Sequence, residues 1–274
     1  MGMQVGFIGT GNMGRILIEA FIRARALKPG QIHASNRTFA KAVDLAKTYP
    51  GLNVYPGNGR VAQKSDLLFL CVKPLEYKTV IEEIAQDIRE EQIVISITSP
   101  VSIADLESRL KGKIAKVIPS ITNQVGKGVT LLMAGSRLKS REKEQLFSLL
   151  SKISQPIWLE EKYTRVASDI TSCGPAFISF LMERMACAAE EVTGLPQPQA
   201  LTLITHMLAG TAALLENNMS LETLRQMVTV PGGVTAVGLA VLDEETKTLF
   251  HKLFKATHQK FDQDVQKVYE LFQG

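Results

Sequence analysis

The first 158 residues alternate short apolar segments with longer amphipathic ones. Segments of four to six residues rich in Val, Ile, Leu and Phe are predicted to be β-strands, at residues 4–8, 32–35, 67–72, 93–97, 114–118 and 129–133. Amphipathic stretches between most of them are predicted to be helices, at residues 13–26, 39–48, 77–87, 103–110 and 141–151. Residues 67–72 are apolar at every position, which is typical of a parallel sheet covered on both faces. The alternation predicts a Rossmann-type, doubly wound α/β domain.

The pattern changes after Trp158, where strand-like segments end and helical periodicity follows. Helices are predicted at residues 163–192, 197–217, 221–228, 234–243 and 245–272. Turn-forming residues separate several of them, at 194–196 (Gly-Leu-Pro), 217–218 (Asn-Asn) and 231–233 (Pro-Gly-Gly). We therefore predict two domains, an α/β domain over residues 1–162 and an all-helical domain over residues 163–274.

Composition limits the class of protein. The chain has 274 residues, of which 45% are hydrophobic and 21% charged, as is typical of a soluble globular protein of about two domains. It holds no uninterrupted apolar run of the ~18 residues that a membrane helix needs, and no secretion signal, so we expect a cytoplasmic protein without a membrane segment. The three cysteines and four histidines are scattered, which predicts neither a disulfide framework nor a metal site.

Charge is distributed unevenly between the two predicted domains. Residues 1–162 carry 23 Lys and Arg against 15 Asp and Glu, whereas residues 163–274 carry 8 against 12. A mildly basic first domain suits a ligand that bears phosphates. No basic run with interleaved aromatic residues is present, so nucleic acid is not an expected partner.

The sequence Gly9-Thr10-Gly11-Asn12-Met13-Gly14 follows the first predicted strand and opens the first predicted helix. This G-x-G-x-x-G spacing in this position is typical of a turn that binds the pyrophosphate of a dinucleotide. The first glycine permits the tight turn, the second lets the backbone approach the pyrophosphate, and the third lets the helix pack closely on the sheet. The free N–H groups of the helix then face the anion.

The end of the second predicted strand indicates which dinucleotide is bound. An acidic residue at this place would accept hydrogen bonds from the ribose 2′-OH of NAD, but the chain reads Ser35-Asn36-Arg37-Thr38. The guanidinium of Arg37 offers a fork of donors to a 2′-phosphate. The sequence therefore favours NADP(H) over NAD(H).

With these motifs in view, the chain resembles the pyrroline-5-carboxylate reductase family over nearly its whole length. The most diagnostic match is Val-Thr-Val-Pro-Gly-Gly-Val-Thr at 228–235, because it lies far from the nucleotide turn and has no general structural reason to accompany it. The other matching segments are residues 6–13 (Gly-Phe-Ile-Gly-Thr-Gly-Asn-Met), 58 (Asn), 71–74 (Cys-Val-Lys-Pro), 118–122 (Ile-Pro-Ser-Ile-Thr) and 173–177 (Cys-Gly-Pro-Ala-Phe).

The resemblance implies which residues bind the cofactor. The pyrophosphate would lie on the glycine turn, the 2′-phosphate end beside the second strand, and the nicotinamide-side ribose at the end of the third. The residues concerned are, in that order, Gly9, Thr10, Gly11, Asn12 and Met13; Asn36, Arg37 and Asn58; and Val72, Lys73 and Pro74.

The resemblance also implies a substrate, 1-pyrroline-5-carboxylate, which the family reduces to L-proline by hydride transfer to a cyclic imine. Backbone N–H groups of the Pro-Gly-Gly loop would bind the carboxylate of this imino acid, and Thr235, the candidate catalytic residue, would point its hydroxyl at the ring nitrogen. The implied substrate-binding residues are Val230, Gly232, Gly233, Val234 and Thr235. A homodimer or a larger ring of dimers, formed through the C-terminal helices, is implied as well.

Departures from the family pattern suggest an alternative. Val230 stands where family members usually carry Ser, and a lost hydrogen bond to a charged ligand group is worth roughly 1.5–3 kcal/mol. Val234 also departs from the usual Thr or Ala, and the altered segments 96–100, 118–123, 165–170 and 172–177 are similar to a late-competence branch of the family. They favour a regulatory protein that keeps the fold and the cofactor site with weak or altered activity. A third hypothesis keeps catalysis but changes the substrate to another imine or to a β-hydroxyacid. The β-hydroxyacid is disfavoured, because residues 163–192 lack the lysine that β-hydroxyacid dehydrogenases use.

Overall fold

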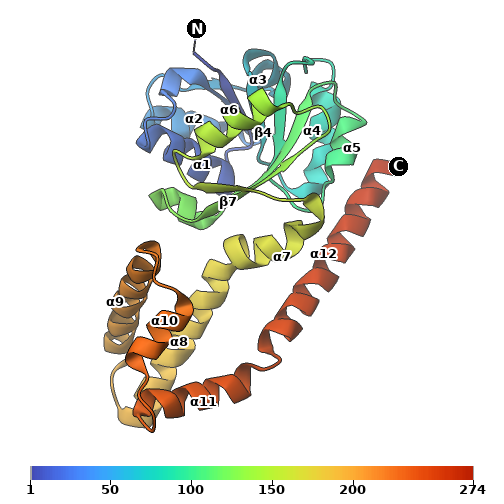
Figure 1. Cartoon of the computed structure of the whole chain (residues 1–274). Coiled ribbons are helices and arrows are strands. Elements are labelled where there is room, and N and C mark those ends of the chain that lie inside the picture. Colours follow the sequence, from blue (N-terminus) through green and yellow to red (C-terminus); the bar gives the residue numbers. More distant parts are fainter. Residues whose placement is uncertain (1, 274) are drawn as a thin grey trace. The chain divides into compact units, whose positions relative to one another are not determined.

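The computed structural model describes residues 2–273 and contains an eight-stranded sheet with helices on both faces (Figure 1). The strand order is β3-β2-β1-β4-β5-β6-β7-β8, and every neighbouring pair is parallel except β6 and β7. The order reverses at β1, which lies between β2 and β4, and doubly wound sheets bind ligands at such a switch point. The strands are β1 Val5–Ile8, β2 Ile32–Ser35, β3 Asn53–Tyr55, β4 Leu67–Leu70, β5 Ile93–Ser96, β6 Lys113–Ile118, β7 Val129–Ala134 and β8 Gln155–Trp158.

Six of these strands match the predicted segments, and the predicted doubly wound α/β fold is confirmed. The strands β3 and β8 were not predicted. They form the two edges of the sheet, where an uninterrupted apolar run is not required. β3 has three half-buried residues, and β8 contains Pro156, which an edge strand tolerates because it need not donate to a second neighbour.

Alternate residues of the central strands face two separate layers of helices. Phe7 and Phe69 pack into the core beneath α1, α2 and α6, with their rings stacked 5.0 Å apart, whereas Ile8 and Leu70 pack into the core beneath α3, α4 and α5. These helices are α1 Asn12–Arg23, α2 Phe39–Thr48, α3 Asn58–Lys64, α4 Tyr77–Ile84, α5 Ile103–Glu107 and α6 Ser140–Leu150; the 3₁₀ helices are η1 Pro29–Gln31, η2 Pro74–Glu76, η3 Ile121–Val125 and η4 Glu161–Tyr163.

The remainder of the chain is helical, as predicted, but its first helix is interrupted. The predicted helix at residues 163–192 consists of α7, a π-helical turn (η5) and α8, because the chain widens ahead of Gly174-Pro175, where proline lacks a backbone donor. The helices are α7 Thr164–Ser168, η5 Asp169–Cys173, α8 Gly174–Thr193, α9 Gln197–Glu216, α10 Leu221–Val228, α11 Val234–Thr246 and α12 Leu249–Gln273.

The chain forms two compact units. One, the α/β unit, comprises the residues up to Cys173 together with those from Thr257 onward; the other, the helical unit, is Gly174–Ala256. The end of α12 belongs to the α/β unit because Phe272 is buried in its core and Arg109 donates to the Phe272 carbonyl at 3.0 Å. The predicted boundary after residue 162 stays a sequence-based expectation: it marks where the strands end, whereas the compact units divide at Cys173 and Thr257.

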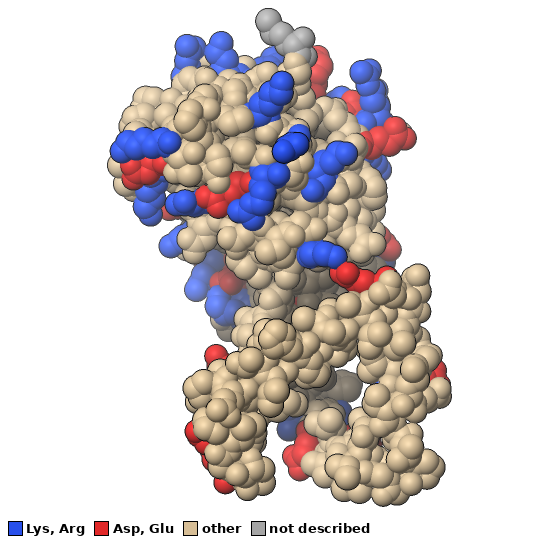
Figure 2. Space-filling view, turned by 90° about the vertical axis from the view of Figure 1, so that its left-hand side faces the viewer, with Lys and Arg blue, Asp and Glu red and all other residues tan. Residues whose placement is uncertain are grey.

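The helical unit exposes many large apolar side chains. Its buried cluster is small (Ala186, Ala200 and Ile204), and on the face shown in Figure 2 few charged side chains lie on this unit. Large apolar side chains are exposed on several of its helices, among them Phe180, Met185, Leu203, Met207, Val237 and Val241. One of its helices, α9, is long and apolar enough to cross a membrane by length and composition alone, although polar residues interrupt its apolar run.

Candidate cofactor site

The glycine turn after β1 can be formed only by glycine at two of its positions. Gly9 has a φ of +99°, and a Cβ atom there would lie 2.5 Å from the Cys71 carbonyl oxygen. A Cβ atom on Gly14 would lie 2.1 Å from the Gly9 carbonyl oxygen. The turn and the first helical turn of α1 are therefore in direct backbone contact, which is the close packing that the sequence motif predicts.

The second glycine of the motif, Gly11, faces open space. Gly11 caps the N-terminus of α1, and no described atom comes within 4 Å of where its Cβ would lie. The N–H groups of the first turn of α1 are thus accessible, and a helix N-terminus carries partial positive charge. This is the geometry that binds a phosphate group.

Thr10 supplies a second observation that points to a ligand at this turn. Its N–H donates to Asn36 Oδ1 at 3.0 Å, which joins the turn to the loop after β2. Its hydroxyl is buried and belongs to the few buried side-chain groups that lack a hydrogen-bond partner within residues 2–273. A buried hydroxyl without a partner is costly, and a phosphate oxygen at the helix N-terminus would satisfy it. The residues present therefore fit the pyrophosphate of a dinucleotide.

A crevice of about 840 Å³ opens at the carboxyl ends of β1, β2 and β4. Seven of the residues predicted to bind cofactor line it: Gly9, Gly11, Asn36, Arg37, Asn58, Val72 and Lys73. The other four are adjacent in the chain: Thr10 is a buried residue of the turn, Asn12 and Met13 begin α1, and Pro74 begins η2. The structure thus gathers the predicted cofactor residues in and around one crevice, while the role of each residue remains a prediction.

The crevice also contains charged residues that the sequence did not single out. Lys41 lies four positions after Arg37 on the first turn of α2, a spacing that could have indicated a second cation. Glu76 and Glu83 come from η2 and α4, and no motif connects them with the nucleotide turn. Only the fold brings these carboxylates to the crevice.

Hydrogen bonds connect the residues on the β2 side of the crevice. Ser35 Oγ donates to Asn58 Oδ1 at 2.6 Å, and Asn58 Nδ2 donates to Glu83 Oε2 at 2.5 Å. Arg37 Nη1 donates to Glu76 Oε1 at 2.6 Å, although the Arg37 side chain is 86% exposed. These contacts connect the ends of β2 and β4 across the end of β1.

Two titratable groups beneath the crevice are held neutral. Burial raises the pKa of the Cys71 thiol and that of the Tyr77 phenol far above their usual ranges. Tyr77 donates to the Leu70 carbonyl at 2.9 Å and lies 3.0 Å from Ser96 Oγ. Both groups therefore act as packing and positioning groups under β4 and β5, and neither is a nucleophile at neutral pH.

The loop predicted to bind substrate lies in the helical unit, between α10 and α11. Gly232 has a φ of +70°, which favours glycine, and a Cβ atom on Gly233 would lie 2.6 Å from Val230 Cγ2 and would displace that side chain. Gly233 caps the N-terminus of α11, and Thr235 is exposed in its first turn. Val230 and Val234 are 65% and 91% exposed. The loop thus presents a helix N-terminus flanked by two apolar side chains.

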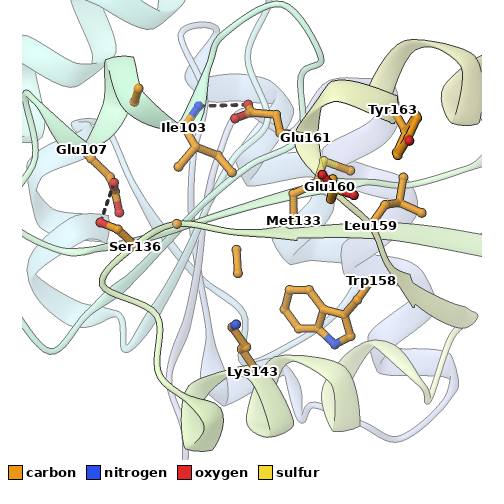
Figure 3. A pocket seen from close by; sticks show the side chains of 13 residues that line it. Ile103, Glu107, Met133, Ser136, Lys143, Trp158, Leu159, Glu160, Glu161 and Tyr163 are labelled. Carbon is orange, nitrogen blue, oxygen red and sulfur yellow. Dashed lines mark hydrogen bonds between the residues drawn. The ribbon is translucent and has the colours of Figure 1, made fainter.

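A second hollow, of about 810 Å³, lies beside β7 and β8 (Figure 3). Its carboxylates already have partners: Glu107 accepts from Ser136 Oγ at 2.8 Å, and Glu161 accepts from the Ile103 N–H at 3.0 Å. Glu161 also accepts from Lys116 Nζ at 2.5 Å, and burial lowers the pKa of that lysine. This hollow holds a satisfied structural network. Within residues 2–273, no three His, Cys, Asp or Glu side chains gather as metal ligands.

The strand order, the glycine turn and the accessible helix N-terminus together define a dinucleotide-binding domain of the oxidoreductase class. Two family models match the chain in agreement with this class. Residues 4–100 match "NADP oxidoreductase coenzyme F420-dependent", and residues 161–264 match "Pyrroline-5-carboxylate reductase dimerisation".

Known proteins align with most of the chain. ComE operon protein 4 of Bacillus subtilis is 39% identical over 98% of this chain and 99% of its own. The pyrroline-5-carboxylate reductase of Methanosarcina acetivorans is 30% identical over 88% of this chain and 90% of its own. The solved structure of a pyrroline-5-carboxylate reductase from Coxiella burnetii superposes with a TM-score of 0.84, at 29% identity and 98% coverage of both chains. The chain belongs to the pyrroline-5-carboxylate reductase family.

Family membership confirms the resemblance read from the motifs and the class of NAD(P)-dependent oxidoreductase. The similarity to ComE operon protein 4 agrees with the altered motifs, which resemble the ComER-like, late-competence branch. The substrate and the contribution of each site residue remain predictions.

Proposed function

We propose that this protein binds NADPH in the crevice of the α/β unit and reduces 1-pyrroline-5-carboxylate to L-proline. The observation that carries the proposal is the turn at Gly9–Gly14, where the accessible helix N-terminus at Gly11 directly follows Thr10, whose buried hydroxyl lacks a partner among the described residues. When bound, the nicotinamide would supply a hydride to the carbon of the protonated imine, whose nitrogen keeps its proton in the product amine. The chain's own residues bind and orient the two reactants, which is the larger part of what this reaction requires.

The proposed preference for NADPH over NADH rests on the crevice wall after β2. Arg37, Thr38 and Lys41 lie there together, and they offer a guanidinium, a hydroxyl and an ammonium group to a 2′-phosphate. The matching family model, which describes NADP oxidoreductases, supports the same cofactor. NADH lacks the phosphate and would gain nothing from these donors.

The proposed substrate site is the loop at residues 230–235. N–H groups at the start of α11 bind the carboxylate of the imino acid, aided by the helix dipole. The Thr235 hydroxyl hydrogen-bonds the ring nitrogen and so orients the imine. Val230 and Val234 provide apolar surface for the ring.

A homodimer, or a ring of such dimers, is the proposed assembly, in a cytoplasmic protein with no nucleic-acid partner. The helical unit exposes Leu203 and Met207 on α9, and Val237 and Val241 on α11, at 51–64% of their side-chain surface. Apolar surface on this scale marks an interaction site, and the family model that covers the unit describes dimerisation. A second copy would cover α9, so its apolar composition needs no membrane.

NADPH oxidation with pyrroline-5-carboxylate, measured beside an equilibrium titration of NADPH, tests the proposal. We expect turnover with the wild type. Thr235→Val should lower kcat about 10- to 100-fold with little change in NADPH affinity, since one hydrogen bond to a charged group is lost. The matched control is Thr229→Val in the same loop, whose hydroxyl donates to the Arg225 carbonyl at 2.6 Å. It should change kcat less than about threefold.

The same measurements decide between this proposal and the regulatory alternative, which the similarity to ComE operon protein 4 favours. Tight NADPH binding without turnover would reject proline formation and support a regulatory role. A Val230→Ser variant would then show whether the missing hydroxyl is responsible, because it restores the donor that most family members carry at this position.

A further inference from the structure

The ion pair between Arg37 and Glu76 spans the proposed adenosine end of the crevice. Arg37 follows β2 and Glu76 belongs to η2, which follows β4, and these two strands flank β1. The pair therefore joins the segments that follow the two neighbours of β1. Both residues line the crevice.

The Glu76 carboxylate is held from two sides. One oxygen accepts from Arg37 Nη1 at 2.6 Å, and the other lies 3.4 Å from the Lys73 backbone nitrogen, which caps η2. The side chain is only 33% exposed, whereas that of Arg37 is 86% exposed. Glu76 is thus the anchored partner, and it keeps a negative charge at the guanidinium that the 2′-phosphate of NADPH would use.

Sequence alone suggests that no acidic residue serves the adenosine ribose, because β2 ends in Ser-Asn-Arg-Thr. In the folded chain, however, η2 places the acidic residue Glu76 beside the loop after β2. A carboxylate in this position accepts hydrogen bonds from a free ribose 2′-OH and repels a 2′-phosphate. The site therefore holds a carboxylate beside the cation typical of NADP binding.

We propose that Glu76 is a specificity-determining residue that competes with the 2′-phosphate for Arg37 and so keeps the preference for NADPH over NADH small. The inference rests on the proposed function, because it assigns the adenosine end of the NADPH site to this part of the crevice. A dianionic phosphate that binds Arg37 displaces Glu76 or shares the guanidinium with it, and the two anions repel each other in either arrangement. NADH has no 2′-phosphate, so it does not compete with Glu76 for Arg37.

Equilibrium binding of NADPH and NADH to the full-length protein tests this inference without requiring turnover. Glu76→Gln should tighten NADPH binding about three- to tenfold and leave NADH binding unchanged or up to about threefold weaker. Glu82→Gln is the matched control, since Glu82 is an exposed residue of α4 outside the crevice and carries the same charge change. It should change neither affinity more than about 1.5-fold.

A double-mutant cycle separates competition at Arg37 from a general effect of charge. In an Arg37→Ala background, Glu76→Gln should tighten NADPH binding clearly less than it does in the wild-type background, because only the direct repulsion between the carboxylate and the 2′-phosphate is then removed. An equal tightening in both backgrounds would overturn the inference, as would an unchanged ratio of the two cofactor affinities in Glu76→Gln. Wild-type protein that binds neither cofactor would instead overturn the proposed function, and this inference with it.

Discussion

Gly9, Gly11 and Gly14 occupy one motif but carry different physical constraints. Gly9 and Gly14 are required by the fold, because a Cβ atom on either would lie within 2.5 Å of a backbone oxygen. Gly11 has an ordinary negative φ and open space in front of it, so the folded chain alone does not require glycine there. Its requirement, on the proposed function, comes from the approach of a phosphate group.

Alanine substitutions at these two kinds of position should therefore separate stability from binding. Gly14→Ala should lower the free energy of unfolding by about 2–3 kcal/mol, because the helix must move away from the turn. Gly11→Ala should change it by less than about 0.5 kcal/mol and yet weaken NADPH binding at least about tenfold, because its methyl group occupies the phosphate position. Urea unfolding and an NADPH titration measure the two quantities. Normal NADPH affinity in Gly11→Ala would contradict the assignment of this turn to the pyrophosphate.

At the scale of elements, the junction between the π-helical turn and α12 is built around a buried carboxylate. Asp169 is 1% exposed, and it accepts from Arg165 Nη2 at 2.7 Å and from Thr257 Oγ1 at 2.7 Å. Arg165 and Thr257 come from α7 and α12, so one side chain ties the start of the helical region to its last helix. π-Helical turns are uncommon, and here the turn aims Asp169 into this contact.

Removing this carboxylate should be costly. Asp169→Ala should lower the free energy of unfolding by about 3 kcal/mol, because the Arg165 guanidinium, 17% exposed, loses its counter-charge. The control is Asp264→Ala on α12, which removes the exposed pair with Lys260 and should cost less than about 1 kcal/mol. Chemical denaturation of both variants measures the difference. Equal losses would show that Asp169 contributes no more than a surface ion pair.

The predicted boundaries of helices and strands agree with the structure where an element has a continuous core face, and they differ from it elsewhere. The apolar runs identified six strands because both faces of those strands are buried. The pattern missed α3, a helix of seven residues that begins at Asn58, because so short a segment shows little periodicity. It also missed the interruption at η5, because a change of helical hydrogen bonding ahead of Gly174-Pro175 leaves the apolar pattern unchanged.

At the scale of the whole molecule, the exposed apolar side chains of the helical unit lead us to predict that charged substitutions there prevent dimer formation. Leu203→Glu combined with Val241→Glu should convert the proposed dimer into monomer, because two charges would be buried without partners in the interface. A charge of the same kind on α6 of the α/β unit, Phe147→Glu, should leave the assembly intact; Phe147 is 40% exposed. Light scattering after size exclusion gives the mass, and circular dichroism checks that the helices remain. Wild-type protein that is monomeric at micromolar concentration would contradict the proposed dimer.

The sequence by itself determined the fold class, the nucleotide turn and the family, because these depend on local patterns: apolar runs, glycine spacing and contiguous motifs. It also placed Arg37 just after β2 and so favoured NADP(H) over NAD(H) as the cofactor. Tertiary structure alone decided what faces Arg37. Glu76 lies 39 positions further along the chain, and it reaches the guanidinium only because β2 and β4 are parallel neighbours of β1. The same holds for Phe272, which joins the core of the first unit because the last helix returns to it. Contacts between distant segments depend on the topology of the sheet, which no single stretch of sequence contains.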